Sequence, residues 1–380
     1  MSEYQYYEFQ AIDRPLTTQE QAMLRNYSSR ATITSSRFVV DYSWGDFKGN
    51  AAEWMETYFD AFLYLASWGS HELMLRLPRN VLRLETAEQY CAGDFASARA
   101  RGDFLVLAFR SDDEEGGEWI DEDNDTLASL LPVRAELVSG DLRALYIAWL
   151  GCAQAGELED EDLEPPCPPG LGKLSPALEA FANFLRIDDD LIETAATASA
   201  ELGVTDGAAL EAWVAALPEE QKTSILIRLV GGAEASLRGE ILRNFRESHA
   251  ANTPAAKSNA RTVGDLLKAA EGRANERRRQ EAERGAREKA RRQREAAEAR
   301  DCYLTSLAKR EAQAWRDVDA LIATKQPKKY DEAVVLLRDL RDVCVRAGRH
   351  GDAVTRIARL LEEHAKKASL IDRFRKAALL

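Results

Sequence analysis

Residues 272–300 read GRANERRRQEAERGAREKARRQREAAEAR, and this stretch decides how the chain is organised. It consists almost wholly of Arg, Glu, Gln, Lys and Ala, which are strong helix formers. Opposite charges recur four residues apart, as in Glu288 and Arg292, and each such pair stabilises a helix by a few tenths of a kcal/mol. The sequence therefore predicts a charged helix, which we place over residues 262–316.

The apolar positions of this helix are nearly all alanine. A two-stranded coiled coil needs a continuous seam of Leu, Ile or Val, so we expect a single solvated helix. Thr262 and Asp265 have the spacing of a capping box at its start, and the small polar residues 251–261 before it predict a hinge. The charged helix then separates an acidic front part of the chain from a short helical tail.

The charge distribution leaves a second interpretation open for this helix. The chain has a net charge of −13, yet residues 257–300 hold 14 Lys and Arg against 8 Asp and Glu. Seven arginines are candidates for phosphate contacts: Arg277, Arg278, Arg284, Arg287, Arg291, Arg292 and Arg294. Against nucleic-acid binding, acids are interspersed among them and no aromatic residue lies there to stack on bases. A charged, solvated helix is the favoured interpretation.

Before the charged helix, residues 1–111 predict an α+β domain. Alternating apolar residues indicate strands near 4–12, 32–44, 73–77, 95–100 and 104–109, and the spacing of Trp54, Met55, Phe59 and Phe62 predicts a helix over 51–66. This order favours a mixed sheet with helices on one face, for which a ferredoxin-like plan is the nearest common type.

From residue 126 to 250 the pattern is helical and predicts a bundle of five or six helices, interrupted by an acidic, Pro-rich loop at 157–176. Between the two parts lies DDEEGGEWIDEDND, residues 112–125. Asp121, Asp123 and Asp125 have the first three ligand spacings of a calcium-binding EF-hand loop. Thr126 stands where that loop requires Gly, so a solvated acidic loop is the favoured reading.

The tail, residues 317–380, predicts a helical hairpin module. Its expected partner-docking face consists of Tyr330, Leu337, Leu340, Val354, Ile357 and Leu361. The phrase YDEAV, residues 330–334, resembles the second helix of a tetratricopeptide repeat. Fewer than the three repeats that such arrays need are present, so a small helical module is favoured.

The opening EYQYYEFQAIDRPLT, residues 3–17, together with WGDFKG at 44–49 and KQPKKYDEA at 325–333, resembles uncharacterised bacterial proteins with this front domain and a similar tail. The resemblance spans most of the chain. It implies a bacterial origin and a coherent multi-domain design, and it brings no known activity.

Composition narrows the class of protein. Five separated cysteines without a C-x-x-C pair and only four histidines argue against a disulfide framework or a metal centre, and we expect no cofactor. No apolar run approaches a membrane span and no signal region opens the chain, so we expect a cytoplasmic protein without membrane contact. The only compact polar cluster beside a predicted strand end is Asp41, Asp46 and Lys48, which is more typical of a turn.

These features predict a non-enzymatic adaptor. Its helical parts would dock a protein partner within a multi-component bacterial system, and the charged helix would serve as a spacer. The alternative is a nucleic-acid-associated protein that contacts phosphates through residues 273–300.

Overall fold

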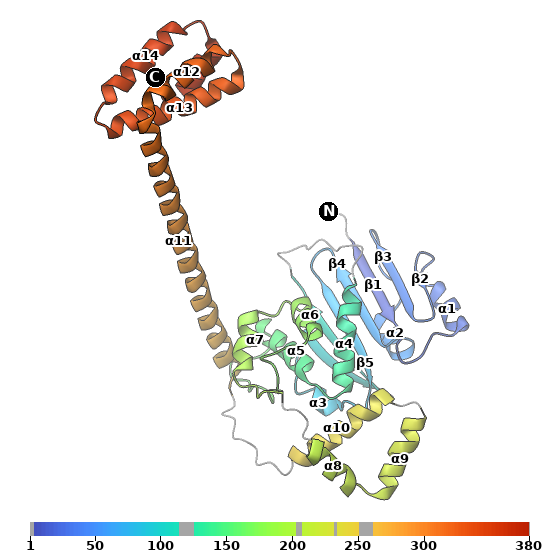
Figure 1. Ribbon diagram of the computed structural model, residues 1–380. Helices are drawn as coiled ribbons and strands as arrows, with labels where there is room; N and C mark the ends of the chain where they lie inside the picture. The colour runs from blue at the N-terminus through green and yellow to red at the C-terminus, as the bar shows by residue number, and fades with distance from the viewer. Residues whose placement is uncertain (1–3, 114–124, 203–206, 232–233, 251–260, 380) are drawn as a thin grey trace. The chain divides into compact units, whose positions relative to one another are not determined.

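The computed structural model describes residues 4–113, 125–202, 207–231, 234–250 and 261–379 (Figure 1). They form two compact units, residues 1–276 and 277–380, which we take in turn. The first unit holds a β-sheet with helices and the second is helical throughout. The predicted class, an α+β front followed by helices and mostly α overall, is confirmed.

The sheet has seven strands in the order β2-β3-β1-β4-β5-β7-β6. All neighbouring pairs are antiparallel, so the sheet is not mixed as we expected, and β1 lies between two antiparallel neighbours, which a ferredoxin-like plan does not allow. The strands are β1 (Gln5–Gln10), β2 (Thr32–Ile33), β3 (Arg37–Tyr42), β4 (Ala61–Ala66), β5 (His71–Pro78), β6 (Ala96–Arg101) and β7 (Phe104–Ser111).

One face of the sheet carries an aromatic core beneath α1 (Thr18–Arg25) and α2 (Ala51–Thr57). Helix α1 begins at Thr18 because Thr17 and Glu20 form a reciprocal capping box. In this core Phe9 packs against Phe62, with ring centroids 4.4 Å apart. The residues alternate along each strand with those of the opposite face, as the two-residue period of a strand requires.

The opposite face, over β4, β5, β7 and β6, packs against one short helix of the front part and the first four helices of the predicted bundle. The covering helices are α3 (Leu84–Ala87), α4 (Thr126–Val138), α5 (Arg143–Gln154), α6 (Pro176–Phe184) and α7 (Asp189–Ala196). Nearly every residue of α5 is buried, Leu145 and Tyr146 completely. Sheet and helices share this one core, so the sequence boundary between residues 111 and 126 separates two layers of a single compact unit.

The helix predicted over residues 51–66 is wrong in its second half. Helix α2 ends at Thr57, and AFLYLA, residues 61–66, is the central strand β4. Its residues are buried on both faces, with Leu63 in one core and Phe62 in the other. A strand covered on both sides has an unbroken apolar run, and periodicity alone cannot distinguish such a run from a buried helix.

The remaining helices of the first unit are α8 (Gly207–Ala216), α9 (Glu219–Val230) and α10 (Glu234–Ala250). Helix α10 contacts α4, where Gly239 approaches the carbonyl of Val138 so closely that a Cβ would lie 1.6 Å from that oxygen. Helix α9 has no buried residue: Leu226 and Leu229 are 60% and 44% exposed, and Ile225 is half-buried. The apolar residues of α9 that we expected inside the bundle therefore lie on its surface.

The second unit consists of the C-terminal part of α11 (Val263–Lys309) with α12 (Glu311–Ala323), α13 (Pro327–Arg346), α14 (His350–Glu363) and α15 (Ala368–Lys376). The charged helix ends at Lys309, short of the predicted residue 316, and α12 starts two residues later. Trp315, Leu337, Leu340 and Phe374 lie in the core that these helices enclose. The expected hairpin is thus part of a larger helical module.

Candidate functional site

Helix α11 begins inside the core of the first unit. The Oγ1 of Thr262 accepts a hydrogen bond from the backbone N–H of Asp265 at 3.2 Å, as the capping motif predicts. Val263 and Leu266 are fully buried in the core between sheet and helices. Ahead of this start, the guanidinium of Arg261 pairs with Glu164 of the acidic loop at 2.7 Å. These contacts hold the N-terminal end of the charged helix in the sheet-containing unit.

The same helix enters a different core at its other end. Leu304 and Leu307 are buried among the residues of the C-terminal helical module. Every residue from 275 to 303 between these two anchors is exposed. One continuous helix therefore contributes to two hydrophobic cores, and its side chains are exposed between them, with Arg300 and Tyr303 at the C-terminal end of the interval bonded to Asp339 of α13.

Ion pairs follow this solvated interval. Glutamates four residues away pair with five of the seven arginines that we considered for phosphate contacts: Arg277, Arg287, Arg291, Arg292 and Arg294. The other two, Arg278 and Arg284, are exposed. Neighbouring glutamates thus offset much of the positive charge that a polyanion would need, and phosphate contact by these arginines stays a prediction.

Most of the predicted docking face lies in the interior of the C-terminal unit. Tyr330, Leu337, Leu340 and Ile357 are at most 6% exposed and belong to its core. Val354 is 49% exposed and Leu361 is half-buried. The apolar stripe that suggested a docking face is the one by which α13 and α14 pack inside the module, which is the usual role of such a stripe.

A surface groove of about 790 Å³ lies between α12 and α14 of this unit. Its walls combine carboxylates, guanidinium groups and small apolar side chains: Asp319, Ala323, Asp352, Thr355, Arg356, Arg359, Leu360, Glu363 and His364. The sequence pattern could not indicate it, because the groove is formed by two helices that are separated by the whole of α13.

Two cation contacts fix the helices that bound the groove. The guanidinium of Arg356 on α14 lies over the ring of Trp315 on α12, 4.5 Å from its centroid, which is a cation–π geometry. At the start of α12, Arg349 pairs with Glu311 at 2.6 Å and lowers the pKa of that carboxyl. The shape of the groove is therefore held by specific contacts between the helices that form it.

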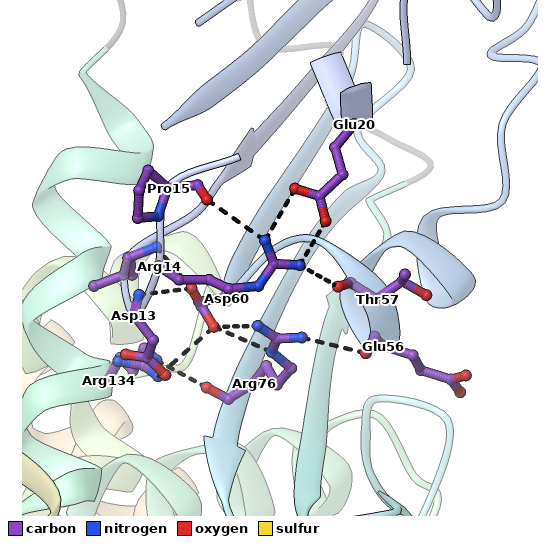
Figure 2. A network of polar contacts seen from close by, with 10 residues as sticks. Asp13, Arg14, Pro15, Glu20, Glu56, Thr57, Asp60, Arg76 and Arg134 are labelled. Carbon is purple, nitrogen blue, oxygen red and sulfur yellow. Dashed lines mark hydrogen bonds and ion pairs between the residues drawn. The ribbon is translucent and has the colours of Figure 1, made fainter. Parts of the chain in front are cut away.

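In the first unit, a polar network joins β5, α4, the residue before β4 and the segment after β1 (Figure 2). The carboxylate of Asp60 is fully buried and accepts two hydrogen bonds from the guanidinium of Arg76, at 2.7 and 3.1 Å. It also accepts the backbone N–H groups of Ile12 and Asp13, at 2.6 and 2.9 Å. Arg134 of α4 donates to the carbonyl of Arg76 at 2.8 Å. A fully satisfied network of this kind fixes the sheet and leaves no atom of Asp60 available for chemistry.

The polar cluster around WGDFKG forms a turn. The Oδ1 of Asp46 accepts a hydrogen bond from the buried amide of Gln5 at 3.0 Å, whereas Trp44 is 76% exposed. His71 of β5 stacks on Phe184 and lies 3.2 Å from a guanidinium nitrogen of Arg186. Of the EF-hand-like residues, Asp121 and Asp123 lie outside the described residues.

No protein-family model, no curated protein and no solved structure matches the chain. Among the helices that the structure describes, none is both long and apolar enough to cross a bilayer. In the same described ranges, no three His, Cys, Asp or Glu side chains gather in a metal-binding arrangement.

Proposed function

We propose that this protein is a non-enzymatic adaptor that docks a protein partner through its C-terminal helical module. One observation carries the proposal: α11 contributes buried residues to two hydrophobic cores and is exposed at every position from 275 to 303. No side chain in this interval is buried, and its contacts with α13 are made by its last residues, where Arg300 pairs with Asp339 at 2.7 Å. Linkage of two folded units is the role that its chemistry fits.

The composition of the interval suits a spacer. An α-helix rises about 1.5 Å per residue, so the 29 residues from 275 to 303 correspond to roughly 45 Å. Isolated helices are only marginally stable in water, and each ion pair at i,i+4 adds about 0.2–0.5 kcal/mol. Gly285 opposes this by about 1 kcal/mol. Buried ends and repeated pairs such as Arg292–Glu288 together offset that cost.

The docking surface that fits this proposal is the groove between α12 and α14, in place of the buried face predicted from the sequence. Its wall presents both signs of charge beside Ala323 and Leu360. A partner segment that carries a short apolar anchor flanked by charges would match this lining, since specific interfaces combine a small apolar centre with a polar rim.

The proposal is tested by capturing partners on the full-length protein and on two matched variants. Thr355→Trp fills the groove, whereas Val335→Trp adds the same side chain to an exposed position of α13 that does not line it. We expect the specific partner to be retained by wild type and Val335→Trp, and lost from Thr355→Trp and from a chain ending at residue 300. Equal capture by all four would refute the proposed docking surface.

A further inference from the structure

Of the two units, only the second carries a net positive charge. Residues 277–380 hold 27 Lys and Arg against 17 Asp and Glu, a balance of +10. Residues 1–276 hold 24 against 47, a balance of −23, and the two values add to the −13 of the whole chain. The C-terminal unit is therefore a cationic body on an acidic protein, and an anionic partner would be drawn to it.

Within this unit a group of lysines lies beyond the charged helix. Five lysines, which we call the lysine cluster, lie in the α12–α13 connection, the first turn of α13 and the α14–α15 connection: Lys325, Lys328, Lys329, Lys366 and Lys367. The two connections are adjacent, because the ammonium of Lys367 donates to the carbonyl of Ile322 at 3.2 Å and lies 6.0 Å from the ring centroid of Tyr330. Residues more than 35 positions apart in the sequence thus form one basic surface.

Most of this cluster is not neutralised. Lys329 pairs with Glu332 at 2.7 Å. Lys325, Lys328 and Lys366 are exposed, and across the described ranges no carboxylate lies within ion-pair distance of these three. This contrasts with α11, where most of the candidate arginines have a glutamate one turn away.

Helix electrostatics do not account for the cluster. A cation near the end of a helix is favourable, which explains Lys325 after α12. Lys328 and Lys329 lie in the first turn of α13, and Lys366 and Lys367 directly precede α15, where a cation is unfavourable by about 0.3–1 kcal/mol. Neither helix has an acid in its first turn or a side-chain cap. Glu332 offsets the charge of Lys329, and Lys367 donates to the carbonyl of Ile322. Lys328 and Lys366 are therefore the two without a compensating contact among the described residues. Residues that break a local rule without a compensating gain in the fold indicate a function.

We propose that the lysine cluster binds the phosphodiester backbone of duplex nucleic acid. Lysines contact phosphates as point charges without reading sequence. Tyr330, the aromatic residue next to the cluster, is 6% exposed, so it cannot stack on a base. The binding is therefore electrostatic and independent of sequence. This binding does not depend on the α12–α14 groove or on the adaptor proposal. It assigns the phosphate contacts to the lysine cluster, whereas the sequence suggested the arginines of α11.

The test measures binding of the full-length protein to a fluorescein-labelled 20-base-pair DNA duplex by anisotropy, between 50 and 200 mM salt. Two variants with the same change of charge are compared: Lys325→Gln/Lys328→Gln/Lys366→Gln in the cluster and Arg284→Gln/Arg287→Gln/Arg291→Gln on α11. If three phosphates are lost, the slope of log affinity against log salt flattens by about 2.7. We expect at least about a tenfold loss of affinity at 50 mM salt for the cluster variant and less than about threefold for the helix variant.

Three results would overturn the proposal: no binding by wild type at 50 mM salt, an equal loss in both triple variants, or displacement of the duplex by polyglutamate as effective as by unlabelled DNA. The last result would indicate an acidic protein as the ligand. Circular dichroism shows whether each variant keeps its helices, as expected for exposed side chains. Thr355→Trp should leave the affinity for DNA unchanged. The proposal of DNA binding by the lysine cluster and the proposal of partner docking in the α12–α14 groove can therefore fail independently.

Discussion

The buried ion pair between Asp60 and Arg76 supports a quantitative prediction. Replacing Arg76 by Met keeps a long apolar stem but leaves the carboxylate of Asp60 in the interior without its main counter-ion. Removing one partner of a buried pair costs about 3–5 kcal/mol. Asp60 keeps two backbone N–H donors, and the guanidinium of Arg134 lies 4.0 Å away, so we place the loss near the lower limit, about 3 kcal/mol.

Hydrogen exchange with mass spectrometry measures this loss where it occurs. At about 1.4 kcal/mol per tenfold, amides of β4 and β5 should exchange roughly 100-fold faster in the Arg76→Met variant. Peptides of α13 belong to the other unit and serve as the internal control, with unchanged rates. Adding Asp60→Asn should restore part of the protection, because a neutral amide is cheaper to bury than a charge. A loss below about 1 kcal/mol, or equal acceleration in α13, would refute this account of the network.

Further predictions concern the start of α1 and the charged helix. Thr17→Ala removes the N-cap and should lower the unfolding free energy of the first unit by about 1 kcal/mol in urea titrations, whereas Thr18→Ala should have little effect. Hydrogen bonds from Arg14 and the backbone N–H of Thr17 lower the pKa of Glu20 from its usual 4.5 to about 2. The stabilisation from the Glu20 carboxylate is present above pH 4.5 and is lost as the pH falls towards 2. Glu20→Gln should therefore make the unfolding free energy depend less on pH between 4.5 and 2. An unchanged pH dependence would contradict this assignment. Ala290→Pro should interrupt α11 and lower helicity by circular dichroism, with protection of the two cores in hydrogen exchange retained.

Local signals in the sequence predicted much of the fold. Alternation identified β1 and β3, and Gly102, with a φ of +55°, closes the β6–β7 hairpin where Arg101-Gly102-Asp103 indicates a turn. The cap at Thr262 also follows from residue types alone. Each of these features is decided by neighbours in the chain, which is why sequence reasoning can find them.

Features decided by tertiary contacts were not predictable in the same way. The apolar run of β4 resembles a helix until the strands on both sides are known. Tyr330 and Leu337 look like a docking face until the rest of the helical module covers them. The α12–α14 groove and the lysine cluster each join segments from different helices, so only packing brings their residues together.

The central claim is that residues 275–303 form one solvent-exposed helix that is not a strand of a coiled coil, and a distance between spin labels tests it most directly. Labels at Ala274→Cys and Ala299→Cys, with the exposed Cys302 replaced by Ser, lie 25 residues apart and close to the same helix face. Double electron–electron resonance should give one narrow distribution near about 38 Å that does not change with protein concentration. A broad distribution at shorter distances, or an added component that grows with concentration, would contradict the claim.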